Sequence, residues 1–344
     1  MSRLAGIFGC SGHKLTADER AFFGEVRPWG YILFARNIGT ADQTRALIDD
    51  LRAASGDENA LVFVDQEGGR VQRLKPPLAR QRRPAEAFGA LYARDPQGAA
   101  EAVRLNHRLI ADELSALGFD ADCAPCIDLR LPETHDVIGD RAFGSEPAEV
   151  SMLGRAALDG LLAGGIAPVI KHIPGHGRAR ADSHMELPVV TTPLEILELT
   201  DFAPFRALAD APMAMTAHVT FTAIDPDDCV TLSHRAISAV IRGGIGFDGL
   251  LMSDDLSMKA LSGKRGGGDF DERARRALEA GCDVILHCNG DMAEMTAVAD
   301  GCVELAGRAA ERAADARAVA RRVQPFDAEA AEAHLDRLGL AGRA

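Results

Sequence analysis

Short apolar runs alternate with segments of helical periodicity along this 344-residue chain. Within the runs, apolar and polar residues do not alternate, which is typical of strands buried on both faces of a parallel sheet covered by helices. We expect strands within residues 1–10 and at about 30–34, 60–64, 119–124, 166–170, 213–217, 249–253 and 282–286. We expect helices at about 16–26, 40–54, 96–117, 148–164, 193–209, 235–242 and 271–280, and from 291 onward with a break at Pro325. Thr16 and Glu19 form a capping-box pattern at the first helix.

Two α/β architectures fit this order of elements, an open doubly wound sheet and a closed (β/α)8 barrel. The polar residues at the strand ends favour the barrel, because only a closed barrel gathers many strand ends around one mouth. These residues are Asp65, Lys171, His172, His218, Asp254 and His287. No glycine-rich turn of the dinucleotide-binding or phosphate-loop kind follows the first strand. The sequence therefore predicts a single TIM-like barrel domain over residues 1–344, with extra C-terminal helices in a tail from about 291.

Residues 171–184 concentrate the titratable groups of the chain in one stretch. They include a lysine, three histidines and an aspartate, and they follow the apolar run at 166–170. Pro174, Gly175 and Gly177 interrupt any helical period, so we expect a loop that leaves the end of a strand. Because helical periodicity returns only at about 193, the connection is long, and long connections in compact domains are usually functional. We expect the chemistry of the protein in this loop.

Composition excludes several classes of partner. The formal net charge of −13 argues against a nucleic-acid backbone and against an anionic membrane surface. No apolar run reaches the ~18 residues that indicate a membrane-spanning helix. The apolar run near the N-terminus is shorter than the ~7–15 residues of a secretory leader. The seven cysteines are an odd, scattered set; we interpret Cys123 and Cys126 as buried thiols and expect a cytoplasmic, reducing location.

Several residues could carry out catalysis. Asp254 follows a strand and can act as a nucleophile or as an electrostatic partner of a developing cation. His184 can transfer protons near neutral pH, and Asp182 can orient its ring. Lys171 on an apolar strand would be costly to bury without a function. Structural interpretations compete with these: Asp254 or Asp255 could cap the next helix, and His218 and His287 could be core histidines.

Three mechanisms use these residues differently. A metal-dependent hydrolase would bind its ion through His172, His176 and His184, and a Schiff-base lyase would react through Lys171. Glycoside hydrolysis would use Asp254 together with proton transfer at His184. Only glycoside hydrolysis also explains Asp65, because carboxylates and Lys or His donors hold vicinal sugar hydroxyls well. A sugar-binding protein without catalysis would need aromatic stacking platforms, and aromatic residues make up only 5% of the chain.

Four motifs resemble glycoside hydrolase family 3, specifically the bacterial β-N-acetylhexosaminidases of cell-wall recycling. They are Asp-Gln-Glu-Gly-Gly-Arg-Val-Gln-Arg at 65–73, Val-Ile-Gly-Asp-Arg-Ala-Phe at 137–143, Lys-His-Ile-Pro-Gly-His-Gly at 171–177 with Asp-Ser-His at 182–184, and Ser-Asp-Asp-Leu-Ser-Met at 253–258. They occur in the order of the family. Together they are specific, whereas each motif alone is weak. Ile173 and the Arg-Ala-Arg at 178–180 depart from the residues that the family often has there.

The resemblance implies a barrel and a retaining double displacement on terminal β-linked N-acetylglucosamine, with no metal or other cofactor. It implies Asp254 as nucleophile and His184 as acid/base, supported by Asp182. Sugar contacts carry over to Asp65, Arg73, Arg141, Lys171 and His172. Muropeptide fragments are the substrate that the resemblance suggests. Phosphate could replace water as the acceptor, because a neutral imidazole repels anions less than a carboxylate does, and a route assisted by the acetamido group remains the mechanistic rival.

Overall fold

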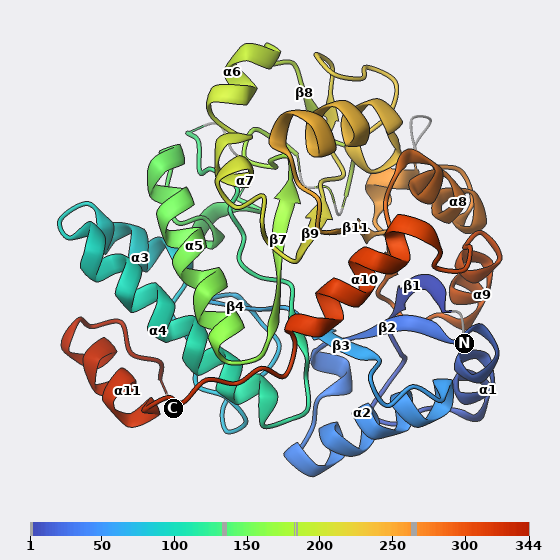
Figure 1. Cartoon of the computed structure of the whole chain (residues 1–344), viewed down its shortest axis with the longest axis horizontal. Coiled ribbons are helices and arrows are strands. Elements are labelled where there is room, and N and C mark those ends of the chain that lie inside the picture. The colour runs from blue at the N-terminus through green and yellow to red at the C-terminus, as the bar shows by residue number, and fades with distance from the viewer. Residues whose placement is uncertain (1–2, 133–135, 182, 184, 263–266, 344) are drawn as a thin grey trace.

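A computed structural model of the protein describes residues 3–132, 136–181, 183, 185–262 and 267–343. Eight parallel strands close into one barrel, in the order β1-β12-β11-β9-β7-β6-β3-β2, so the predicted (β/α)8 fold is confirmed (Figure 1). The barrel strands are β1 (Leu4–Phe8), β2 (Pro28–Leu33), β3 (Leu61–Val64), β6 (Ala121–Asp122), β7 (Ala167–Ile173), β9 (Met213–Thr216), β11 (Leu250–Asp255) and β12 (Val284–His287).

Helices surround the barrel as the sequence pattern predicts. They are α1 (Ala17–Val26), α2 (Ala41–Ser55), α3 (Ala85–Tyr92), α4 (Pro96–Ser115), α5 (Pro147–Ala163), α6 (Leu194–Leu199), α7 (Ala203–Ala207), η4 (Ala236–Ile245, a π-helix), α8 (Phe270–Ala280), α9 (Met292–Asp300), α10 (Gly307–Val319) and α11 (Ala328–Arg337). Short 3-10 turns are η1 (Ala35–Asn37), η2 (Gly139–Arg141), η3 (Val230–Leu232) and η5 (Lys259–Ser262). The capping box at Thr16 and Glu19 is present at the start of α1. Within the described residues, no helix combines the length and the apolar character needed to cross a membrane.

The core has two large compartments, one inside the barrel and one between the barrel and its helices, and a small third cluster of Cys126, Ile138 and Ala142. Inside the barrel, apolar side chains from the strands pack with Ala313, Ala316 and Ala320 at its amino end. These three alanines belong to α10 and the residue that follows it. Helix α10 (orange-red) lies across the strands in Figure 1. The amino end of the barrel is therefore filled with small apolar side chains.

Strand β7 is longer than expected, and this corrects the prediction of a loop from residue 171. Lys171 and His172 belong to the strand, which runs to Ile173. The main chain stays extended because its carbonyls remain bonded on both sides: Ile127 donates to Lys171 at 2.9 Å and Ala217 donates to Ile173 at 2.9 Å. The two polar side chains are therefore anchored in the barrel wall.

Other boundaries differ where the sequence pattern carries no clear signal. The helix expected at 193–209 is two helices, α6 and α7, because Pro204 has no N–H with which to continue the helical hydrogen bonds across the break between them. The C-terminal tail breaks around Pro325 as expected, but it also breaks between α9 and α10. The sequence pattern missed α3, the hairpin of β4 (Gln66–Gly68) and β5 (Val71–Gln72), and the short pair β8 (Val189–Val190) and β10 (Thr220–Phe221).

Candidate active site

A cavity of about 630 Å³ opens at the carboxyl ends of the barrel strands. The predicted site residues Asp65, Arg73, Arg141, Lys171, His172 and Asp254 all line it. They come from the end of β3, the β5 hairpin, η2, β7 and β11, so residues nearly 190 positions apart in the chain line the same cavity. Asp182 and His184 lie outside the described residues. The fold therefore brings six of the eight predicted side chains to one cavity.

Asp65 joins two cations at the cavity wall. Its Oδ1 accepts from Lys171 Nζ at 2.9 Å, and its Oδ2 accepts from Arg73 Nη2 at 2.9 Å. Burial alone would raise the pKa of Asp65, but Lys171 and Arg73 outweigh burial and hold this pKa well below its ordinary value. Asp65 is therefore ionised, and a ligand would meet a carboxylate whose geometry is fixed by its two partners.

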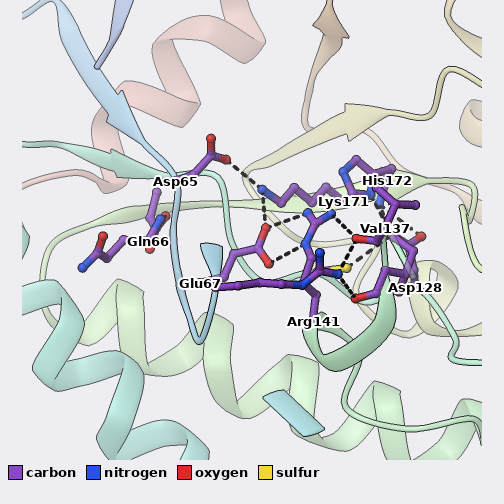
Figure 2. A network of polar contacts seen from close by, with 12 residues as sticks. Asp65, Gln66, Glu67, Asp128, Val137, Arg141, Lys171 and His172 are labelled. Atoms are coloured by element: carbon purple, nitrogen blue, oxygen red, sulfur yellow. Dashed lines mark hydrogen bonds and ion pairs between the residues drawn. The ribbon is translucent and has the colours of Figure 1, made fainter. Parts of the chain in front are cut away.

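Glu67 is a member of this network that the sequence interpretation missed (Figure 2). Its Oε1 accepts from Lys171 Nζ at 2.7 Å, and its two oxygens accept from Arg141 Nε and Nη2 at 2.9 and 2.8 Å. Such a fork-to-fork pair fixes both position and orientation of the guanidinium. Burial alone would lower the pKa of Lys171, but Asp65 and Glu67 outweigh it and raise this pKa above its ordinary value. Lys171 is therefore an ammonium ion in the barrel wall.

The β4–β5 hairpin holds these acids in place through Gln66. Its side-chain oxygen accepts from the main-chain N–H groups of Arg73 and Leu74 at 2.9 and 3.0 Å, and its amide nitrogen donates to the carbonyl of Leu74 at 3.0 Å. At Gly68, where φ is +95°, a Cβ would lie 2.6 Å from the carbonyl oxygen of Arg83. Gly68 of the first motif is thus required by backbone conformation and close packing.

Asp128, which the sequence interpretation also missed, orients the ring of His172. Asp128 is fully buried, and its Oδ2 lies 2.6 Å from His172 Nδ1. It also accepts from the main-chain nitrogen of His176 at 2.6 Å. Burial alone would raise the pKa of Asp128, but its interactions with His172 and His176 outweigh burial and lower it. A carboxylate on Nδ1 leaves Nε2 as the ring nitrogen for a ligand in the cavity.

Asp254 reaches the cavity from the end of β11. Its main-chain nitrogen donates to Thr216 Oγ1 at 3.3 Å, and its Oδ1 accepts from the nitrogen of Asp255 at 2.8 Å. Asp255 instead closes the local turn, because its Oδ1 accepts from the nitrogens of Ser257 and Cys288 at 3.0 and 3.1 Å. Both neighbouring aspartates line the cavity, but the Asp255 carboxyl group also bonds within the turn that follows the strand.

The structure favours a structural role, as core histidines, for His218 and His287. His218 is fully buried and bonds Thr231 Oγ1 at 2.7 Å and the carbonyl of Asp255 at 3.0 Å. Burial lowers the pKa of His218, so it stays neutral. His287 is likewise fully buried and lies 3.0 Å from Glu294 Oε2. Both side chains support the barrel behind the cavity and do not line it.

Ser183, in the described part of the 171–184 stretch, contacts two residues. His176 Nε2 lies 3.2 Å from Ser183 Oγ, and the nitrogen of Ala260 donates to the carbonyl of Ser183 at 3.2 Å. Burial lowers the pKa of His176 to about 4, so its ring is neutral. Among the described residues, the candidate metal ligands are Cys126, Asp128 and His172, whose ligand atoms lie within 4.8 Å of one another. This group differs from the three histidines that a metal hydrolase would have used.

The sequence profile of the glycosyl hydrolase family 3 N-terminal domain matches residues 15–324. The chain belongs to glycosyl hydrolase family 3. A β-hexosaminidase of Alkalilimnicola ehrlichii is 43% identical over 288 residues, which cover 82% of this chain and 80% of the relative. A β-hexosaminidase of Xanthomonas campestris pv. campestris (strain B100) is 36% identical over 329 residues, which cover 95% of this chain and 96% of the relative.

Solved family 3 structures agree with the barrel. NagZ from Neisseria gonorrhoeae, in complex with N-trifluoroacetyl-D-glucosamine, matches with a TM-score of 0.83 and 31% identity over 99% of this chain and 95% of its own. A family 3 β-N-acetylglucosaminidase from Paenibacillus sp. matches with a TM-score of 0.85 and 30% identity, over 97% of this chain and 67% of its own. The comparisons confirm the resemblance seen in the motifs and the enzyme class, a family 3 β-hexosaminidase.

Proposed function

We propose that this family 3 enzyme is a retaining exo-β-N-acetylglucosaminidase that removes terminal β-linked N-acetylglucosamine from muropeptide fragments. The observation that carries this proposal is the shared cavity, which is lined by both Asp254 and a cluster of charged sugar-binding candidates. The volume of about 630 Å³ is ample for a sugar ring and part of its leaving group. The solved Neisseria relative was crystallised with an N-acylated glucosamine.

Asp254 is the nucleophile in this proposal. Its position at the end of a barrel strand fixes its backbone, while its carboxyl group reaches the cavity. In a retaining double displacement it attacks the anomeric carbon, the leaving oxygen is protonated, and a glycosyl-aspartate forms. Water then attacks the same carbon, so the sugar leaves with its original β configuration. The developing positive charge of the ring is stabilised by the same carboxylate.

The proton transfers fall to His184, oriented by Asp182, a role that rests on the Asp-Ser-His motif at 182–184. An imidazole can donate a proton to the leaving oxygen and later accept one from water, because its ordinary pKa of about 6.5 lies near neutral pH. The anchoring of Ser183, the residue between them, by His176 and Ala260 supports a defined approach of this loop to the barrel.

The remaining wall residues bind the sugar in this proposal. Asp65 accepts from hydroxyl groups, Lys171, Arg73 and Arg141 donate to them, and His172 contributes Nε2. We assign muropeptide fragments as the source of the sugar because the motifs resemble the bacterial enzymes of cell-wall recycling. The seven cysteines are all unpaired, which supports a reducing, cytoplasmic location where such fragments would be processed.

Proton NMR of the hydrolysis of an aryl β-N-acetylglucosaminide tests the stereochemistry directly. We expect the β anomer of N-acetylglucosamine to appear first, followed by slow mutarotation to the α anomer. An initial α anomer would show inversion and would reject the double displacement. A parallel reaction with an N-acetylglucosaminyl-1,6-anhydro-muropeptide should release the free sugar; failure there, with an active aryl substrate, would reject only the substrate assignment.

A further inference from the structure

Glu67 is a buried acid whose two carboxylate oxygens are both engaged by cations of the cavity wall (Figure 2). Only 7% of its side chain is exposed, against 9% for Arg141 and 3% for Lys171. Oε1 accepts from both cations and Oε2 accepts from Arg141 Nε. Glu67 itself does not line the cavity, whereas Arg141 and Lys171 do. Any influence of Glu67 on a ligand must therefore pass through these two side chains.

The charges around Lys171 show what Glu67 contributes. The carboxylates of Asp65 and Glu67 favour the ammonium form, whereas the guanidinium of Arg141 opposes it. The ionisable groups that face Lys171 from the surrounding elements are Asp65, Glu67, Asp122, Cys123 and Arg141. Burial raises the pKa of Asp122 to about 8 and raises that of Cys123 well above its ordinary value, so both are neutral at pH 7. Without Glu67, only Asp65 would balance Lys171 against Arg141.

We propose that Glu67 is a positioning residue that holds Lys171 and Arg141 together as a rigid pair of cations facing the sugar. The proposal deepens the proposed function and rests on it. Two like charges in a poorly solvated wall repel strongly unless an anion lies between them. Glu67 supplies that anion and sets the direction of both donors at once. It thereby presents two charged donors to substrate hydroxyls without occupying space in the cavity.

The Glu67→Gln variant removes the charge and keeps the shape of the side chain. We expect kcat/KM for an aryl β-N-acetylglucosaminide to fall by about 10²-fold, as when a positioning contact is lost. We also expect partial rescue by a variant that keeps the charge, which a purely structural role of the side chain would not give. Gln keeps the shape of Glu67 but leaves Lys171 and Arg141 without the anion that they share. If charge sets the positions of both donors, the conservative Glu67→Asp variant should therefore be more active than Glu67→Gln.

Two further variants separate charge from packing. Glu67→Asp keeps the charge on a shorter side chain, so its kcat/KM should lie between those of Glu67→Gln and the parent. Glu113→Gln is the matched control: Glu113 forms an ion pair with buried Arg82, and neither residue lines the cavity. It should lower the thermal midpoint and leave kcat/KM close to that of the parent.

The possible outcomes are decisive. A Glu67→Asp enzyme that is no more active than Glu67→Gln overturns the proposal, and so does an equal loss of kcat/KM in Glu113→Gln. If Glu67→Gln fails to fold, Glu67→Asp is compared with the parent: an unchanged kcat/KM overturns the proposal, whereas a reduced kcat/KM with Glu113→Gln unaffected supports it. An inactive parent enzyme would instead reject the proposed function, which keeps the two failures distinct.

Discussion

At its amino end the barrel is closed by alanine side chains of α10, whereas at its carboxyl end the same strands open on a cavity lined by charged groups. Leu250 and Asp254 illustrate the contrast, because both lie on β11. Leu250 is fully buried among apolar side chains, and Asp254 borders the cavity four residues later. One strand therefore supplies stability at its start and a reactive group at its end, a division typical of this fold. Mutations at the two ends should separate activity from stability.

The largest effect is expected from Asp254→Ala at the cavity end. Loss of the nucleophile should reduce turnover of an aryl β-N-acetylglucosaminide by more than the ~10²–10⁴-fold attributed to general acid–base groups. Release of the aryl group at saturating substrate measures it. The thermal midpoint should stay within a few degrees of the parent, and a large fall in that midpoint would mean that Asp254 serves the fold. Asp255→Asn is a useful comparison at the neighbouring position, because it should affect the turn after β11.

Leu250→Ala tests the opposite end of the same strand. Removing a buried leucine leaves a cavity and should lower the free energy of unfolding by about 2–5 kcal/mol. The kcat/KM of the folded enzyme should change little, because Leu250 does not line the site. Chemical denaturation gives the first quantity and steady-state kinetics at 25 °C the second. A large loss of kcat/KM in fully folded protein would contradict the separation of the two ends.

Asp128→Asn tests a fully buried residue under the cavity and is expected to lower stability. Leaving its N–H donors poorly satisfied should cost about 1–3 kcal/mol of stability. The folded-state pKa of Asp128 is depressed, so its contribution to stability is present above the unfolded-state pKa and is lost as pH falls through the folded-state value. The variant should therefore lose less stability than the parent between about pH 5 and pH 1. Denaturation curves of the parent and the variant across this pH range test the sign of this difference in stability.

The smallest effect is expected for an exposed ion pair far from both ends. Arg20 on α1 bonds Asp50 on α2 at 3.0 Å, and nearly half of each side chain is exposed. Arg20→Ala should change the free energy of unfolding by only about 0.2–1 kcal/mol. Its kcat/KM should equal that of the parent. This variant gives the background against which the Leu250 and Asp128 effects are judged.

The barrel could be predicted from sequence because its strands are uninterrupted apolar runs and its polar residues follow them. The strand conformation of residues 171–173 could not be predicted, because Lys171 and His172 resemble loop residues until the main-chain partners of this segment are known. The hairpin of β4 and β5 was missed because its apolar signal is short and its register depends on the side chain of Gln66.

The missed acids have a related explanation. Glu67 lies within the first motif, yet its partners Arg141 and Lys171 are distant in sequence. The one available signal was Lys171 itself, because a buried ammonium needs nearby carboxylates. Asp128 lies shortly after strand β6 in the sequence. An aspartate that follows a barrel strand was the signal that could have pointed to it. Its pairing with His172 depends on the tertiary structure.

The central claim is that Asp254 attacks the sugar, and trapping the covalent intermediate tests it most directly. The enzyme is incubated with a fluorinated N-acetylglucosaminyl donor that lets an adduct accumulate, and its intact mass is measured. We expect the mass to rise by one fluorinated sugar, with the label on the peptide that contains Asp254 and none on the Asp254→Ala variant. Donor turnover with no adduct would point to assistance by the acetamido group, and an adduct on another residue would contradict the account.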